Sequence, residues 1–321
     1  MQPSPDRGLP EALIGDGRPL LVFTGLCLVL AGGFALFLSA TRHFLPHDVQ
    51  YLGMTAEQLC GIDSCRVVHF MFHDRVSFGG ALIAIGSLYV WLAEFPLREH
   101  QAWAWWLFVV SGIAGFGSFL AYLGYGYLDS WHGVATLLLI PFFVGGLIRS
   151  FVTLPKPARF SSLFKSGTEV SWRTSFGAGR ALLLATAVGM MAGGLTIMTV
   201  GMTRVFVPQD LTFMGITAVD IRAISPRLVP LIAHDRAGFG GAIAATGVLV
   251  LFSVWCGKPS KSLWQVLFFA GAIGFATAIG VHPAVGYVDL VHLAPALIGA
   301  ITFIAGIVLC YRPMVHAGSS R

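Results

Sequence analysis

The feature that most constrains the fold is a series of apolar segments, each long enough to cross a lipid bilayer. A transmembrane helix needs about 20 consecutive, mostly apolar residues. Charged residues make up only 11% of the chain, against about 25% in ordinary soluble domains. The sequence therefore predicts an all-α integral membrane protein with eight transmembrane helices, at residues 19–40, 68–93, 103–125, 129–149, 181–202, 229–255, 263–281 and 288–310.

The distribution of Lys and Arg indicates how these segments are oriented, because cytoplasmic loops collect positive charge. With the N-terminus inside, most of the 20 basic residues fall on the inner side. We therefore expect both termini in the cytoplasm and a bacterial plasma membrane as the location. The basic linker 151–180 would face anionic lipid head groups, so we interpret the net charge of +5 as a membrane contact and expect no nucleic acid.

Three motifs occur twice in the same order, which indicates an internal duplication. Thr-Arg-x-Phe-x-Pro-x-Asp occurs at 41–48 and 203–210, and His-Asp-Arg-x-x-Phe-Gly-Gly-Ala at 73–81 and 234–242. Gly-Tyr-x-Asp-x-x-His occurs at 126–132 and 286–292. The Gly-Gly step in the second motif is typical of close helix contacts in membranes.

Each half of the chain would contain four helices. Because four is an even number, both halves start on the same side of the membrane and the repeats are parallel. We expect two tandem four-helix bundles, at 19–150 and 181–311, joined by the linker 151–180. Residues 1–18 and 312–321 would be cytoplasmic segments.

Four histidines of the repeated motifs fall at one level, near the outer ends of their segments: His73, His132, His234 and His292. We expect the two histidines of each half to face each other across a bundle interior, where cofactor sites are built. Two neutral imidazoles that face each other are the axial ligands that a bis-His heme requires. The pattern therefore favours one or two hemes near the outer face.

Four arginines near these histidines are candidate partners of heme propionates: Arg42, Arg75, Arg204 and Arg236. They could equally extend to the head groups, or pair with Asp74 and Asp235. Asp129 and Asp289 precede a histidine by three residues and could orient its imidazole. Capping the N-terminus of a helix is an equally good interpretation of both carboxylates.

The same residues allow two alternative functions. One is a non-heme metal site, with Asp129 and Asp289 as additional ligands. Adjacent His73 and Asp74 point about 100° apart on a helix, so we expect only one of them to face inward. The other alternative is a proton-coupled carrier of a small solute. Repeated polar residues at one membrane face favour a one-sided cofactor site over a path across the bilayer.

Three further predictions concern the outer side. Cys60 and Cys65 lie close together in the first outer loop, which allows a disulfide on the oxidising side of the membrane. Thr55 and Thr217 are expected to N-cap short helices over the outer face. His282 has no partner in the first half, and we place it at the membrane interface.

Together, these features resemble the heme A synthase family, which has two four-helix halves, a histidine pair in each half and a loop cysteine pair. The resemblance is one of pattern and covers residues 18–312. It implies that His73 with His132, and His234 with His292, are the axial pairs, and that Cys60 and Cys65 are the loop cysteines. It further implies that the N-terminal half handles substrate heme and the C-terminal half holds a heme cofactor.

Phe70 stands where that family carries a Glu, three residues before the histidine. We therefore expect electron transfer or another heme-linked oxidation instead of heme A synthesis. A quinone or a redox partner protein would supply the electrons.

Overall fold

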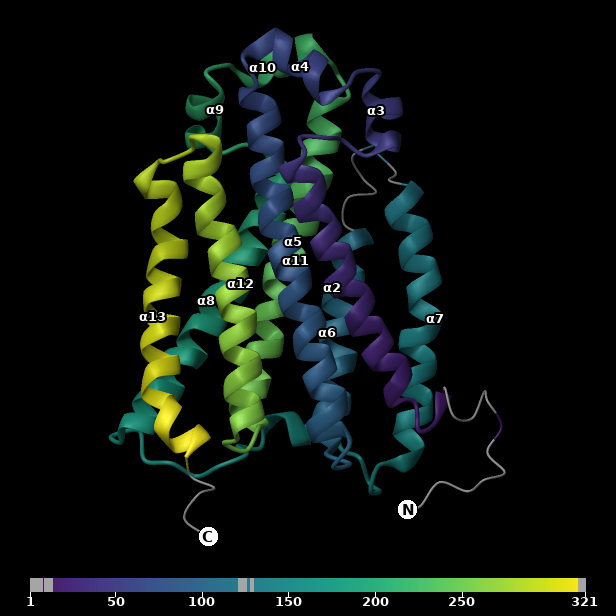
Figure 1. Cartoon of the computed structure of the whole chain (residues 1–321), viewed down its shortest axis with the longest axis vertical. Coiled ribbons are helices and arrows are strands. Elements are labelled where there is room, and N and C mark those ends of the chain that lie inside the picture. The colour runs from purple at the N-terminus through teal and green to yellow at the C-terminus, as the bar shows by residue number, and fades with distance from the viewer. Residues whose placement is uncertain (1–7, 9–13, 121–125, 128–129, 317–321) are drawn as a thin grey trace.

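The computed structural model describes residues 8, 14–120, 126–127 and 130–316, and in this part of the chain every element is a helix (Figure 1). Seven of these helices are long and apolar enough to cross a membrane. They agree with the predicted helical membrane class. They are α2 (Arg18–Ala40), α5 (Arg66–Leu92, continued by the π turn η1, Ala93–Leu97), α7 (Ser130–Thr153), α8 (Ser175–Thr203), α11 (Leu228–Cys256), α12 (Lys261–Val285) and α13 (Leu290–Val315).

The predicted segment 103–125 falls on α6 (Ala102–Leu120). The apolar helix described there, Ala102–Ser118, is shorter than the other seven. Residues 121–125 of that segment lie outside the described residues, so an eighth span stays a prediction.

Four short helices lie together at one end of the bundle, which we call the cap end (Figure 1). They are α3 (Pro46–Leu52), α4 (Ala56–Asp63), α9 (Pro208–Met214) and α10 (Ala218–Ile224). The predicted Thr caps are confirmed: Thr55 begins α4 and Thr217 begins α10, each in a reciprocal capping box. A 3₁₀ turn, η3 (Phe160–Phe164), packs against α6 and α11.

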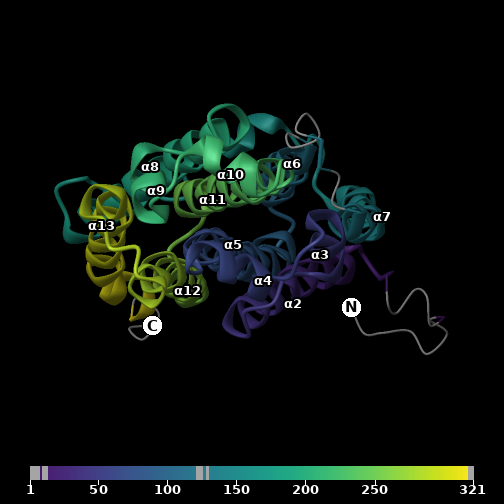
Figure 2. The same cartoon turned by 90° about the horizontal axis from the view of Figure 1, so that it is seen from above.

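Two helices form the centre of the bundle, as the view from above shows (Figure 2). In α5 and α11, 78% and 72% of an apolar 18-residue stretch is buried inside the protein, against 17–28% of the corresponding stretch in the other five long helices. These two helices carry the repeated His-Asp-Arg and Gly-Gly-Ala motifs. The repeated polar residues are therefore placed in the interior, and the other helices shield them.

Two adjacent glycines, Gly79 and Gly80, explain how α5 contacts helices of both halves. Gly79 lies against the backbone of Gly32 in α2, and Gly80 lies against Thr277 in α12. A side chain at either glycine would overlap these neighbours. α5 therefore packs closely against α2 of its own half and α12 of the other half.

The glycine pair on α11 acts in the same way. Gly240 lies against Gly194 of α8, and Gly241 lies against Ser118 of α6. α11 therefore packs against a helix of each half, and also against α5. The helices of the two halves therefore interlock, which differs from the expected two tandem bundles. The reason is that each Gly-Gly step lets its helix pack closely against two neighbours, one from each half.

Candidate functional site

The predicted histidine pairs form across the two halves and not within them. The ring of His73 lies 5.6 Å from that of His292, and the ring of His132 lies 5.5 Å from that of His234, centroid to centroid. The expected pairing of His73 with His132 and of His234 with His292 is therefore wrong. The reason is the interlocked packing, which places α5 against α12 and α11 against α6.

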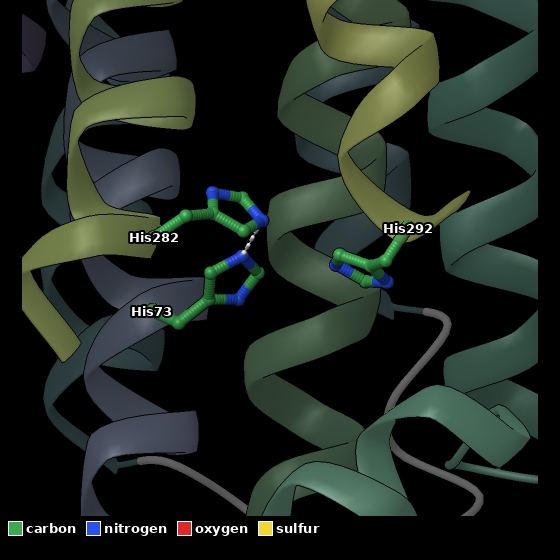
Figure 3. A group of neighbouring side chains, drawn as sticks. All are labelled: His73, His282 and His292. Carbon is green, nitrogen blue, oxygen red and sulfur yellow. Dashed lines mark hydrogen bonds between the residues drawn. The ribbon is translucent and has the colours of Figure 1, made fainter. Parts of the chain in front are cut away.

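His73, His282 and His292 form the first histidine group, in which side chains from α5, α12 and α13 converge (Figure 3). One ring nitrogen of each residue lies within 4.8 Å of the other two. The Nε2 atoms of His73 and His282 are 3.1 Å apart. His73 and His282 are 3% and 4% exposed, and His292 is half-buried.

His282 is buried inside the protein, because the last turn of α12 lies against α5, and its depth at the membrane interface stays a prediction. The sequence did contain a signal. His282 lies near the end of a predicted span, so it falls at the level of the other site histidines. It was missed because only repeated residues were assigned to the site.

Asp74 is buried beside the first group. His73 Nδ1 and Asp74 Oδ1 are 3.0 Å apart, and Arg236 of α11 donates its Nε–H to Asp74 Oδ2 at 3.1 Å. The expectation that only one of His73 and Asp74 faces inward is therefore wrong. α5 is surrounded by other helices, so both of its adjacent faces are interior faces.

A chain of charged and polar groups continues from Arg236. Its Nη1 lies 2.7 Å from Asp210 Oδ2, and the Tyr287 hydroxyl donates to Asp210 Oδ1 at 2.8 Å. Burial raises the pKa of Tyr287, and so does the negative charge of Asp210, so its hydroxyl keeps its proton. The Tyr287 ring stacks on His292, with ring centroids 4.5 Å apart. This chain therefore connects the surroundings of His73 to those of His292.

His47, His132 and His234 form the second histidine group. The rings of His132 and His234 are inclined by 27°, and the His47 ring lies 6.2 Å from that of His132. Tyr127 contacts His234 edge-on, with ring centroids 5.2 Å apart. The second group is thus a facing pair from α7 and α11, with a third histidine at its side.

The network around the second group repeats that around the first. The Tyr127 hydroxyl donates to Asp48 at 2.5 Å, as Tyr287 does to Asp210. Arg75 pairs with Asp48 and Asp235, both at 2.9 Å. Equivalent positions of the two sequence repeats therefore make equivalent contacts.

A pocket of about 350 Å³ adjoins the second group at the cap end. Arg227 donates from Nη1 to the Tyr51 carbonyl at 2.6 Å, and its guanidinium carbon lies 5.6 Å from the Tyr51 ring centroid. The pocket therefore combines aromatic walls with one cationic group. Its lining residues are His47, Gln50, Tyr51, Tyr127, Ser130 and Arg227.

The predicted arginines divide into two kinds. Arg75 and Arg236 pair with carboxylates, as one interpretation proposed, but each takes the Asp of the other half's His-Asp-Arg motif. Their hydrogen bonds are thus directed to aspartates and, for Arg236, also to the Val205 carbonyl. Arg42 and Arg204 are exposed at the cap-end termini of α2 and α8.

Asp289 is an N-cap. Its Oδ1 accepts the backbone N–H of His292 at 2.7 Å, at the start of α13. It therefore fixes the backbone that carries His292, as its capping interpretation proposed. Asp129, its counterpart in the first half, lies outside the described residues.

Cys60 and Cys65 form the predicted disulfide at the cap end, between the last turn of α4 and the residue that precedes α5. Cys256 and Cys310 are buried thiols in the long helices, and Cys27 is half-buried. The disulfide therefore lies immediately before α5, the helix that carries His73.

No family model, curated protein or solved structure matches the chain. The functional conclusions that follow therefore depend on the geometry of the two histidine groups and on the sequence patterns.

Proposed function

We propose that the chain is an integral membrane redox protein that binds heme between His132 and His234, near the cap end. The observation that carries this proposal is the facing pair of imidazoles from α7 and α11, 5.5 Å apart and inclined by 27°. His132 and His234 would hold the heme between them, with neutral imidazoles as the ligands of its iron.

The pocket beside this pair supports the same proposal. Its aromatic walls, Tyr51 and Tyr127, suit the apolar face of a macrocycle, and Arg227 offers a guanidinium for a propionate. Arg227 takes this role because Arg75 and Arg236 are already paired with carboxylates. Bound heme would supply one-electron transfer at this site.

The first histidine group does not suit a heme. His282 Nε2 lies 3.1 Å from His73 Nε2 and so fills the space beside the nitrogen with which His73 would hold a heme. The proposal is therefore one heme per chain, at the second group.

The arrangement of buried ion pairs favours this redox function over a solute carrier. Asp74 and Asp235 are paired with arginines next to the histidine groups. This favours a one-sided centre over a polar path across the membrane. We propose that the cap end faces the outer side of a bacterial plasma membrane, that both termini are cytoplasmic, and that a quinone or a redox protein supplies electrons. The resemblance to heme A synthases points to the same class of function.

A reduced-minus-oxidised absorption spectrum with pyridine hemochrome quantification tests the proposal on protein purified after expression with added heme. The wild type should bind about one heme per chain, with low-spin α and β bands. His132→Ala and His234→Ala should each lose most of this heme while still eluting as a single species. The control is His43→Ala, an exposed histidine at the same end, which should keep the wild-type heme content. A colourless wild type, or full heme content in both site variants, would contradict the proposal.

A further inference from the structure

We infer that His73, His282 and His292 bind a divalent first-row transition-metal ion, which forms a non-heme centre separate from the proposed heme site. The three imidazoles come from three helices and converge on one point (Figure 3). Their ligand nitrogens lie within 4.8 Å of one another. This inference does not depend on heme, because it uses none of the residues of the second group.

The distances suit a small ion. A tetrahedral ion with metal–nitrogen bonds of about 2.0–2.1 Å spaces its ligand atoms roughly 3.4 Å apart. The Nε2 atoms of His73 and His282 are 3.1 Å apart. These two ligand atoms are therefore close to their required separation. The hydrogen bond between them would be replaced when an ion binds, with the proton of His282 moving from Nε2 to Nδ1. The His292 ring needs to move inward by about an ångström at the 4.8 Å limit.

Asp74 prepares His73 for this role. Because the carboxylate accepts a hydrogen bond from Nδ1–H at 3.0 Å, the proton of the neutral imidazole is held on Nδ1. The lone pair is then on Nε2, the atom that faces His282. A carboxylate behind a ligating histidine is the usual support of a metal-bound imidazole, since it fixes the ring orientation and raises the basicity of the ligand.

His292 is also held from two sides. Its backbone N–H is bound by the Asp289 cap, and its ring stacks on Tyr287. Tyr287 in turn donates to Asp210, which pairs with Arg236, which pairs with Asp74. One connected set of groups thus orients both His73 and His292.

His282 has no counterpart in the second group, and this distinguishes the two groups. The third repeated motif aligns position 282 with position 122, which is Tyr in this sequence. The other two ligands belong to repeated motifs, so His282 is an addition particular to the second half. It adds a third imidazole to His73 and His292 from a long helix, whereas the third histidine of the second group, His47, comes from the short helix α3.

The ligand set defines the class of ion. Three imidazoles favour Zn²⁺, Cu²⁺, Ni²⁺ or Co²⁺ over Mg²⁺ and Ca²⁺, which prefer oxygen ligands. Three protein ligands also leave a fourth coordination position for water or a small molecule.

Titration with Co²⁺ tests this inference, because tetrahedral Co²⁺ has visible d–d absorption. The full chain, purified with a histidine-free tag and treated with a chelator, should bind one Co²⁺ per chain and release it to Zn²⁺. His282→Ala should lose these bands but keep its elution profile and the heme content of the wild type. His43→Ala should bind Co²⁺ as the wild type does. Equal Co²⁺ bands in His282→Ala and the wild type, or none in a wild type that elutes as a single species, would overturn the inference.

A second pair of variants tests the role of Asp74. Asp74→Asn should weaken Co²⁺ binding about 10-fold to 100-fold, which is the usual effect of removing a carboxylate behind a ligating histidine. Asp235→Asn is the matched control, since it removes the equivalent ion pair with Arg75 but does not touch the first group. Equal Co²⁺ affinity in the two variants would show that Asp74 does not position His73.

Discussion

Arg75 of α5 and Asp235 of α11 form an ion pair, with 2.9 Å between Nε and Oδ2, although they belong to different halves of the chain. The reciprocal pair, Arg236 with Asp74, is 3.1 Å long. Each arginine also pairs with an aspartate of its own half, Asp48 or Asp210. Two guanidinium groups, that of Arg236 buried and that of Arg75 half-buried, and four carboxylates thus connect the two halves between the histidine groups.

This arrangement predicts that the halves depend on each other for stability. Arg75→Met should destabilise the protein by about 3–5 kcal/mol, because it leaves Asp48 and Asp235 buried without their cation. Thermal unfolding in detergent measures the loss. The exposed Arg42→Met should unfold near the wild-type temperature. Equal unfolding temperatures of the two variants would contradict the proposed role of the ion pairs.

The close contact of α5 with α12 predicts sensitivity to an added methyl group. Gly80→Ala should cost about 1–3 kcal/mol, because its new side chain overlaps Thr277. Gly33→Ala on α2 is the control, since no atom lies within 4 Å of its added carbon. Adding Thr277→Ala to Gly80→Ala should recover part of the loss in a thermal unfolding assay. A neutral Gly80→Ala would argue against this helix contact.

The cap at the start of α13 predicts different results for two substitutions of Asp289. Asp289→Ala should lower stability by about 0.5–2 kcal/mol, because the N–H of His292 loses its acceptor. Asp289→Asn keeps an acceptor at this position, so its unfolding temperature and Co²⁺ affinity should stay close to those of the wild type. If Asp289→Asn instead abolished Co²⁺ binding, Asp289 would be a metal ligand and not only a cap.

The disulfide gives a test of orientation. In a variant with Cys27, Cys256 and Cys310 replaced by Ala, Cys60 and Cys65 are the remaining cysteines. A membrane-impermeant maleimide should label intact cells only after reduction, because the cap end is predicted to face outward. Labelling that needs lysed cells would place the cap end inside and reverse the proposed topology.

Much of the helical architecture could be predicted from apolar length alone, because a bilayer sets the minimum length of a crossing helix. The Thr caps and the disulfide were also predictable, since both depend on residues close in sequence. Helix neighbours were not predictable in this way. Core-facing and lipid-facing side chains are both apolar in a membrane protein, so the pattern does not show that α5 packs against α12.

The error in helix neighbours explains the errors in the site. The similar depth of His73 and His292 in the membrane follows from their positions in their predicted spans. Their pairing, however, depends on which helices pack against each other. The inward direction of both His73 and Asp74 depends on α5 being enclosed on all sides. His282 was missed because attention to the repeat excludes a residue that occurs in one half only.

The most direct test of the account compares heme and metal content in the same preparations of wild type, His234→Ala and His282→Ala. Hemochrome analysis gives the heme content, and elemental mass spectrometry after Zn²⁺ loading and desalting gives the non-heme metal. The account predicts that His234→Ala loses heme and keeps Zn²⁺, and that His282→Ala loses Zn²⁺ and keeps heme. Loss of heme in His282→Ala together with full heme content in His234→Ala would contradict the assignment of heme to the His132 and His234 pair.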